Sequence, residues 1–160
     1  MKRNSINFFI VAIVFFLFVT SCKQIDLQEQ NTAIPQNKWQ SNFITKNTFE
    51  IKDTNVMYDV YAVIRHTDAY EYSNIWLNVG FQQIGDTMKY QKRNLTLAND
   101  AAKGWKGIGM NDIWEVRELI ARENLKKGTY TIAIGHVMRQ NPLLNIMNVG
   151  VRVEKSTRQQ

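Results

Sequence analysis

The residue with the most distinctive chemistry is Cys22, the only cysteine in this chain of 160 residues. It directly follows Val19-Thr20-Ser21, a run of small residues of the kind found where a secretion signal is cleaved. Cleavage at that point would make the thiol part of the first residue of the mature chain. No other thiol then remains for a disulfide, a thiolate zinc site or a cysteine nucleophile.

The segment before Cys22 has the features of a secretion signal. Lys2 and Arg3 give a positive start, and residues 8–19 (FFIVAIVFFLFV) are apolar without a break. Twelve helical residues reach about 18 Å, well short of a hydrocarbon core of about 30 Å, so residues 1–21 are predicted to be a signal peptide. The order V-T-S-C resembles the bacterial lipobox, whose cysteine is acylated with a diacylglycerol. The alternative is an ordinary signal peptide with an incidental cysteine.

The mature chain is predicted to begin with an acylated residue and a flexible tether, residues 22–38. Two or three acyl chains anchor a protein stably, whereas one does not. Residues 23–38 are rich in Gln and Asn, contain Pro35 and have no aromatic residue, a composition that buries too little apolar surface to order itself. Trp39 marks the change to a globular domain, residues 39–160, whose length fits one domain.

The remaining candidate chemistry is sparse, and no enzyme activity, cofactor or metal site is predicted. His66 and His136 have no metal-ligand partner at a suitable spacing, and His136 is expected to be partly buried with a hydrogen-bond partner. Gly104, Gly107 and Gly109 match no phosphate-binding motif and favour a tight loop. The carboxylates are scattered, so no glycosidase pair can be nominated.

The positive charge of the chain does not indicate a nucleic-acid partner. The formal net charge is +6, and it falls to +4 when Lys2 and Arg3 leave with the signal peptide. The densest basic cluster is Lys89, Lys92 and Arg93, but acidic residues are interspersed along the chain and no aromatic platform accompanies the cluster. A solvated basic face is the better interpretation.

Alternating apolar and polar residues predict β-strands in the rest of the chain. The clearest strands are residues 57–66, 75–82, 130–135 and 147–154, and shorter candidates lie at 48–52 and around Leu95 and Leu97. Turn signals separate them at Gly85-Asp86, Asn99-Asp100, Lys127-Gly128 and Asn141-Pro142.

Residues 113–124 fit either a strand or a helix. Asp112-Ile113-Trp114-Glu115 resembles a helix capping box, whereas Trp114, Val116 and Ile120 would share one face of a strand. The strand is favoured because the flanking chain is strongly β. Six or more short strands predict an all-β fold, an antiparallel, jelly-roll-like β-sandwich, preceded by the signal peptide and the tether.

Several segments together carry a family resemblance. Its most specific pieces are Ile64-Arg65-His66-Thr67 with Tyr70 and Asn74, then Trp105-x-Gly107-x-Gly109, and Met138-Arg139 followed by Pro142-Leu143. With the lipobox, these segments resemble the gliding-motility lipoprotein GldH family of Bacteroidetes over roughly residues 39–155. The resemblance implies a non-enzymatic envelope lipoprotein that is required for gliding and associated with the type IX secretion machinery.

The same resemblance carries over one functional residue, the acylated Cys22. Lys23 follows it instead of an aspartate, and no acidic run follows, which resembles lipoproteins sorted to the outer membrane and kept on its periplasmic face. The expected partners are therefore the membrane, through the lipid anchor, and other gliding and type IX secretion proteins of the envelope.

Three residues are candidates for partner docking or for pinning loops: Arg65, Trp105 and Arg139. Each arginine follows or ends a predicted strand, and arginine beside aromatic residues is common at interface hot spots. We expect the three to lie near one another, or near an exposed sheet edge or aromatic loop that a partner could use. The alternative is that each arginine forms an internal ion pair with Asp59, Asp86 or Asp112.

A second function class, a periplasmic or surface glycan-binding module, stays open. It requires exposed aromatic residues, for which Trp76, Trp105 and Tyr72 are the candidates, although Trp76 and Trp105 are predicted first of all as core residues. A third class, an enzyme acting on a glycan or peptide, would require a pair of carboxylates clustered in a cleft.

Overall fold

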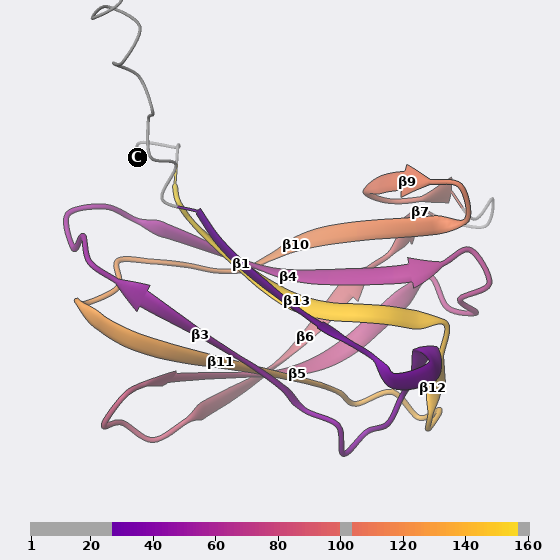
Figure 1. The fold of residues 1–160 in the computed structure, drawn as a ribbon, viewed down its shortest axis with the longest axis horizontal. Coiled ribbons are helices and arrows are strands. Elements are labelled where there is room, and N and C mark those ends of the chain that lie inside the picture. Colours follow the sequence, from indigo (N-terminus) through magenta and orange to yellow (C-terminus); the bar gives the residue numbers. More distant parts are fainter. Residues whose placement is uncertain (1–26, 100–103, 157–160) are drawn as a thin grey trace, which may run out of the picture.

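Two antiparallel sheets packed face to face form the domain (Figure 1). The computed structural model describes residues 27–99 and 104–156. The larger sheet has five strands in the spatial order β1 (Leu27–Ala33), β13 (Ile146–Lys155), β4 (Tyr58–Thr67), β10 (Ile113–Glu123) and β9 (Ile108–Met110). The smaller sheet has four, in the order β3 (Thr45–Ile51), β11 (Gly128–His136), β5 (Asn74–Gln83) and β6 (Lys89–Thr96).

Short elements lie at one end of the sandwich (Figure 1). A 3-10 turn, η2 (Pro35–Asn37), follows β1, and two pairs of two-residue strands lie outside the main sheets: β2 (Lys38–Trp39) with β12 (Leu143–Leu144), and β7 (Ala98–Asn99) with β8 (Gly104–Trp105). The predicted all-β antiparallel sandwich is confirmed.

The core lies between the two sheets and follows the predicted alternation. In β5, Ile75, Leu77 and Val79 are buried while Trp76 is exposed on the opposite face, as a period of two residues requires. In β3, every second residue from Thr45 to Ile51 is buried. Trp39 is fully buried, and its indole Nε1–H donates to the Phe43 carbonyl over 2.8 Å.

Residues 113–123 form a strand, β10, which settles the ambiguity of this segment in favour of the strand. β10 pairs with β4 along its whole length, from Ile113 opposite Thr67 to Glu123 opposite Tyr58. The register shifts between Leu119 and Ala121, a bulge of the kind that changes which face a residue presents. Ile120, the extra residue, is 4% exposed.

The predicted boundary between tether and domain needs correction, because the sheet begins at Leu27 and not at Trp39. β1 lies inside the segment predicted as tether and pairs with β13 from Leu27 opposite Glu154 to Ala33 opposite Asn148. The glutamines that suggested disorder have a structural role. The side-chain amides of Gln28 and Gln30 each donate to, and accept from, one residue of β3.

These amide bonds close the gap between the two sheets along one side. Gln30 donates to the Thr48 carbonyl at 2.7 Å and accepts from the Thr48 N–H at 3.1 Å, and Gln28 bonds Glu50 in the same way at 3.0 and 3.4 Å. Each side chain thus replaces the backbone partner that the edge strand β3 lacks.

Some predictions concern residues outside the described part of the chain. The predicted signal peptide (residues 1–21), the predicted acylation site Cys22 and residues 23–26 are among them. Within the described ranges, no helix is long and apolar enough to cross a membrane.

Candidate functional site

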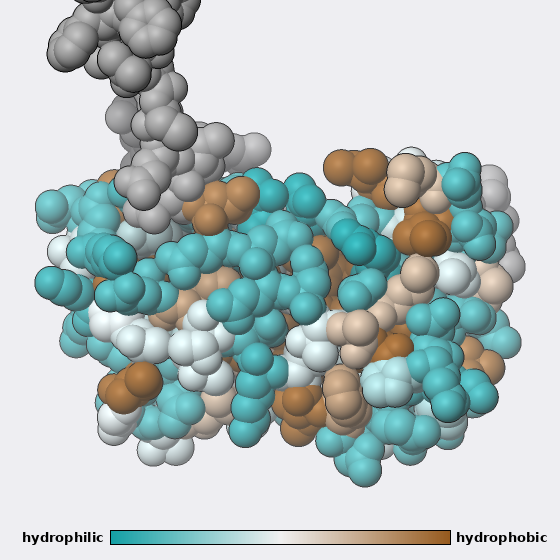
Figure 2. All heavy atoms as spheres, in the orientation of Figure 1, coloured by the Kyte–Doolittle hydropathy of each residue, from teal (hydrophilic) through white to brown (hydrophobic). Residues whose placement is uncertain are grey.

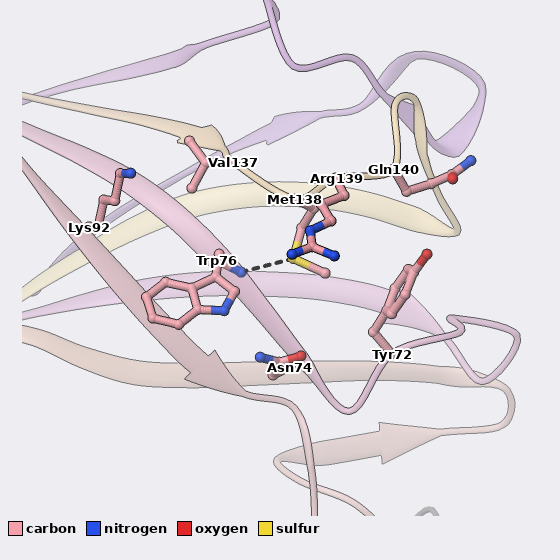
Figure 3. Close-up of a pocket in the computed structure, with 8 residues that line it drawn as sticks. All are labelled: Tyr72, Asn74, Trp76, Lys92, Val137, Met138, Arg139 and Gln140. Atoms are coloured by element: carbon pink, nitrogen blue, oxygen red, sulfur yellow. Dashed lines mark hydrogen bonds between the residues drawn. The ribbon is translucent and has the colours of Figure 1, made fainter.

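A hollow of about 620 Å³ lies beside the start of β5, and we call it the Trp76 hollow (Figure 3). Its lining comes from four parts of the chain: the turn before β5, β5 itself, β6 and the segment after β11. The side chains that line it are those of Tyr72, Asn74, Trp76, Lys92, Val137, Met138, Arg139 and Gln140. Figure 3 shows the rings of Trp76 and Tyr72 on opposite sides, with the Arg139 guanidinium between them.

Backbone and side-chain bonds hold the hollow in shape. The Trp76 N–H donates to the Met138 sulfur over 3.2 Å, and the Trp76 carbonyl accepts from the Val137 N–H over 2.9 Å. Further along, the Asn141 side chain accepts from the Ser41 N–H over 2.9 Å. The segment after β11 is therefore bonded to β5 and to the β2–β3 loop, so the hollow is formed before any ligand arrives.

The charge of the Trp76 hollow is positive. Arg139 and Lys92 line it, no carboxylate does, and neither cation has an ion-pair partner among the residues that the structure describes. The predicted internal ion pair of Arg139 with an aspartate is therefore absent from that part of the chain. Trp76 is 44% exposed, so the prediction that it is a core residue is wrong, because the outer face of β5 is not covered at that position.

Trp105 does pack against the core, as predicted, and lines neither hollow described here. Its ring meets the His66 ring edge-on at 4.6 Å between centroids, and it lies 6.3 Å from the ring of Tyr70. Tyr70 is buried and contacts Tyr72 edge-on at 5.7 Å. This aromatic cluster links Trp105 to one wall of the Trp76 hollow. Trp105 is thus a support of the fold in this region.

The two histidines are buried, with one ring nitrogen bonded and the other unpaired. The Nδ1 atom of His66 lies 2.8 Å from the Thr67 carbonyl, and the Nε2 atom of His136 lies 3.0 Å from the Trp39 carbonyl. A carbonyl only accepts, so each of these nitrogens carries the proton. The opposite nitrogens have no partner among the described residues. Burial lowers the pKa of both imidazoles, and the carbonyl bond only partly offsets it. The predicted hydrogen-bond partner of His136 is confirmed.

We expect stability to fall on mild acidification because of these histidines. The unfolded chain takes up their protons near pH 6.5, whereas the folded chain does so only at lower pH, so the stabilisation is complete above pH 6.5 and decreases below it. Unfolding in urea at pH 7.5 and 5.5 measures the loss, in a window where carboxylates stay ionised. His66→Phe keeps ring packing on Trp105 and should show a smaller loss. An unchanged loss in the variant would contradict this account.

Arg65 lines a second hollow of about 450 Å³, the Arg65 hollow, on the outer face of the larger sheet. Ile108 and Met110 of β9, which are 67% and 72% exposed, form its apolar rim with Ile113 and Met147. Figure 2 shows the apolar atoms gathered where Figure 1 places β9. Arg65 and Arg139 therefore line different hollows, one on each sheet, and each hollow has exposed apolar side chains.

Arg65 forms an ion pair, but its partner is Glu115 of the neighbouring strand β10 and not a predicted aspartate. Asp59 is instead bonded by Arg122 at 2.5 and 2.8 Å, and this bond lowers the Asp59 pKa. Burial raises the pKa of Glu115, but the two guanidinium groups of Arg65 and Arg117 outweigh burial and the net pKa is lowered.

These charges continue as a network across the outer face of the larger sheet. Arg117 lies 2.7 Å from Glu115 and 3.8 Å from Glu29, and Arg152 lies 3.5 Å from Glu29 and 2.7 Å from Glu154. Three glutamates and three arginines alternate, so this face is close to neutral while the Trp76 hollow is positive. Among the described residues, no group of His, Cys, Asp or Glu could hold a metal ion.

The sequence did not predict which residues share a hollow. Asn74, Lys92, Met138 and Gln140 line the Trp76 hollow without having been site candidates. The sequence did single out two of them, Asn74 and Met138, because both are among the residues that carry the family resemblance. Lys92 was recognised only as part of a basic cluster, and no feature of the sequence pointed to Gln140.

Comparison with known proteins identifies the family. A model of the family described as GldH lipoprotein matches residues 26–153. The chain belongs to the GldH lipoprotein family. A relative from Christiangramia forsetii, described as a gliding motility lipoprotein GldH homolog, is 30% identical over 169 residues, which cover 96% of this chain and 98% of that protein. The GldH match starts one residue before β1, in agreement with the corrected domain boundary.

Two solved structures were also compared with this GldH family chain. The infectious bursal disease virus VP2 subviral particle has a TM-score of 0.33 and 10% identity, covering 84% of this chain and 34% of that one. The dimeric latent PorU from Porphyromonas gingivalis has a TM-score of 0.33 and 8% identity, covering 88% and 14%. Likenesses of this degree do not bear on function.

Proposed function

We propose that the mature chain is a non-enzymatic interaction module of the gliding apparatus. It is anchored to the outer membrane through acylated Cys22, on the periplasmic face, and docks on other envelope proteins of gliding and type IX secretion. The observation that carries this proposal is the match to the GldH lipoprotein family over nearly the whole folded domain. The lipobox and the Lys23 that follows Cys22 support the anchor and its sorting.

The position of β1 supports one orientation of the module on the membrane. From Cys22 to Leu27 the chain advances five residues, which reach at most about 18 Å. The end of the sandwich with the start of β1 would therefore face the lipid. β5 starts at the opposite end of the sandwich. Its last residue, Gln83, pairs with Tyr130 just after the β10–β11 turn, and Glu123, just before that turn, lies opposite Tyr58. Tyr58 in turn pairs with Lys155, next to the partner of Leu27 at the start of β1. The Trp76 hollow, beside Asn74, would then face away from the membrane.

The anchor is tested by removing the thiol. We expect Cys22→Ala to lose acylation, to leave the membrane fraction and to abolish gliding. Stable anchoring takes two or three acyl chains, and the variant has no thiol to carry them. Mass spectrometry of the mature terminus and membrane fractionation give the readout. Ser21→Ala, which keeps a small residue before the cysteine, serves as the control. A Cys22→Ala chain that stays on the membrane and supports gliding would overturn the anchor.

The docking role is tested at the two arginines. Arg139 has no ion pair among the described residues, so Arg139→Ala should leave the melting temperature unchanged and weaken crosslinking to envelope partners in intact cells. Arg65→Ala breaks the bond to Glu115 and should lower the melting temperature by several degrees. If Arg139→Ala lowers the melting temperature as much and leaves crosslinking intact, Arg139 pins the fold and does not dock a partner.

Glycan binding is the second candidate function, and the placement of Trp76 and Tyr72 on one hollow favours it. Of the three aromatic candidates, Trp105 is excluded from that surface because it packs on the core. Retention of the full-length lipoprotein on insoluble peptidoglycan, in detergent, is the first test. Equal retention of wild type and Trp76→Ala would argue against binding in this hollow.

A further inference from the structure

The lining of the Trp76 hollow combines two kinds of group that suit a ligand, aromatic rings and cations that lack an ion pair among the described residues. Two aromatic rings, Trp76 and Tyr72, stand at its sides, and Trp76 is 44% exposed although Trp is costly to leave in water. The cations Lys92 and Arg139 face the hollow without a carboxylate. Its volume, about 620 Å³, falls within the range of small-molecule sites.

We propose that the Trp76 hollow binds an acidic saccharide, a sugar chain whose rings carry carboxylates. This inference rests on the glycan-binding candidate above and specifies its site and its ligand class. The positive lining selects the negative charge, and the aromatic walls select the rings.

Each side chain has a role that fits such a ligand. The flat C–H face of a sugar ring packs on an aromatic face, which the exposed Trp76 indole offers. The Arg139 guanidinium can hold a carboxylate through two parallel hydrogen bonds, and Lys92 adds a second charge. Gln140 offers an amide to ring hydroxyls, whereas one of the two N–H groups of the Asn74 amide already donates to Asn94 over 2.8 Å.

An extended acidic peptide fits this hollow less well, because β5, the strand that carries Trp76, offers it no free edge. β5 is paired on both sides, with β11 and with β6. The N–H and the carbonyl of Trp76 bond Met138 and Val137 at the point where β11 ends. Strand addition needs unpaired backbone groups, and β5 offers none. Recognition at Trp76 therefore uses side chains, whereas a peptide that adds as a strand would use the outer edge of β6.

The site is also rigid, which favours binding of a flexible sugar chain. The Tyr72 ring rests edge-on against buried Tyr70, whose hydroxyl donates to the Asn74 carbonyl over 3.1 Å. Met138 is bonded to the β5 backbone. A preformed site loses less entropy on binding than one that must be ordered.

The test measures binding of acidic oligosaccharides to the full-length lipoprotein in detergent. The probes are oligogalacturonate, alginate and hyaluronan oligosaccharides, each with its methyl ester as the neutral counterpart, and poly-glutamate as an acidic peptide. Isothermal titration gives the Kd, and the part of the fluorescence change that is lost in Trp76→Ala reports on Trp76 among the four tryptophans. The variants are Trp76→Ala and Arg139→Met. The matched controls are Tyr90→Ala, an aromatic residue of β6 that is 51% exposed, and Arg93→Met, since neither residue lines the hollow.

We expect at least one acidic oligosaccharide to bind at least tenfold more tightly than its ester. Trp76→Ala should raise the Kd tenfold or more, Arg139→Met should abolish the preference for the acid, and the two controls should change little. No binding by any acidic probe, equal binding of acid and ester, stronger binding of poly-glutamate, or an unchanged Kd in Trp76→Ala would each overturn the proposal. Membrane localisation and gliding of the wild type test the anchored module separately, so a failure here leaves that function intact.

Discussion

A chain that starts at residue 39 is expected to lose cooperative folding, whereas a chain that starts at residue 24 keeps it. The shorter chain lacks β1, which pairs with β13 over its whole length. It also lacks Ile34, which is 3% exposed in the core. Without β1, one edge of β13 and one edge of β3 lose their partners, and unpaired edges promote aggregation. The loss amounts to several kcal/mol, a large part of the 5–15 kcal/mol that stabilises a domain.

The measurement is urea unfolding of both chains, followed by circular dichroism, with light scattering for aggregation. Equal midpoints for the two chains would mean that β1 is an accessory and that the domain begins at Trp39 after all. A smaller change isolates the amides: Gln28→Met with Gln30→Met removes four hydrogen bonds to β3, at a cost of roughly 1–2 kcal/mol because the bonds are exposed. Gln40→Met, at an exposed position with no side-chain bond described, is the control.

The composition of residues 27–33 predicted a flexible tether, although these residues form the strand β1. A run rich in Gln and Asn usually stays unfolded because it has little apolar surface to bury. In this chain the neighbouring strands β13 and β3 supply the order, and the amides supply bonds that a backbone would otherwise make. Nothing local in residues 27–33 indicates those partners, since β13 lies more than a hundred residues away.

Period-two alternation was a dependable guide for the central strands, where one face is buried. It predicted that Ile75 and Leu77 share a face and that Trp76 lies on the other. It could not predict whether that other face is covered. The Trp76 hollow depends on β5 lying between β6 and β11, so that Lys92 and Arg139 reach the same place from distant parts of the chain. Pairing of Arg65 with Glu115 likewise depends on β4 lying beside β10. Such neighbours follow from sheet topology and not from spacing.

Gly107→Ala is expected to be the most damaging single substitution in the Trp105-x-Gly107-x-Gly109 segment. Gly107 has φ +86°, and a Cβ there would lie 2.0 Å from the Glu115 carbonyl oxygen. The backbone of β10 cannot move away easily, because Glu115 is paired with β4 on one side and with β9 on the other. We expect a loss of at least about 2 kcal/mol, from the left-handed backbone and from the displacement of β9 together.

Gly85→Ala separates the two causes, because Gly85 also has a positive φ, +95°, but a Cβ there would meet nothing within 4 Å. Its loss should be about 1 kcal/mol, the cost of the backbone alone. Amide hydrogen exchange should show faster opening at Ile108 and Met110 in Gly107→Ala only. If the two variants lose equal stability, the close approach to Glu115 does not matter. If Gly107→Ala loses more stability than Gly85→Ala, the segment acts by allowing β9 to pair with β10. The residues of this segment that carry the family resemblance then have a structural role. They hold β9 in place, and β9 supplies the apolar rim of the Arg65 hollow.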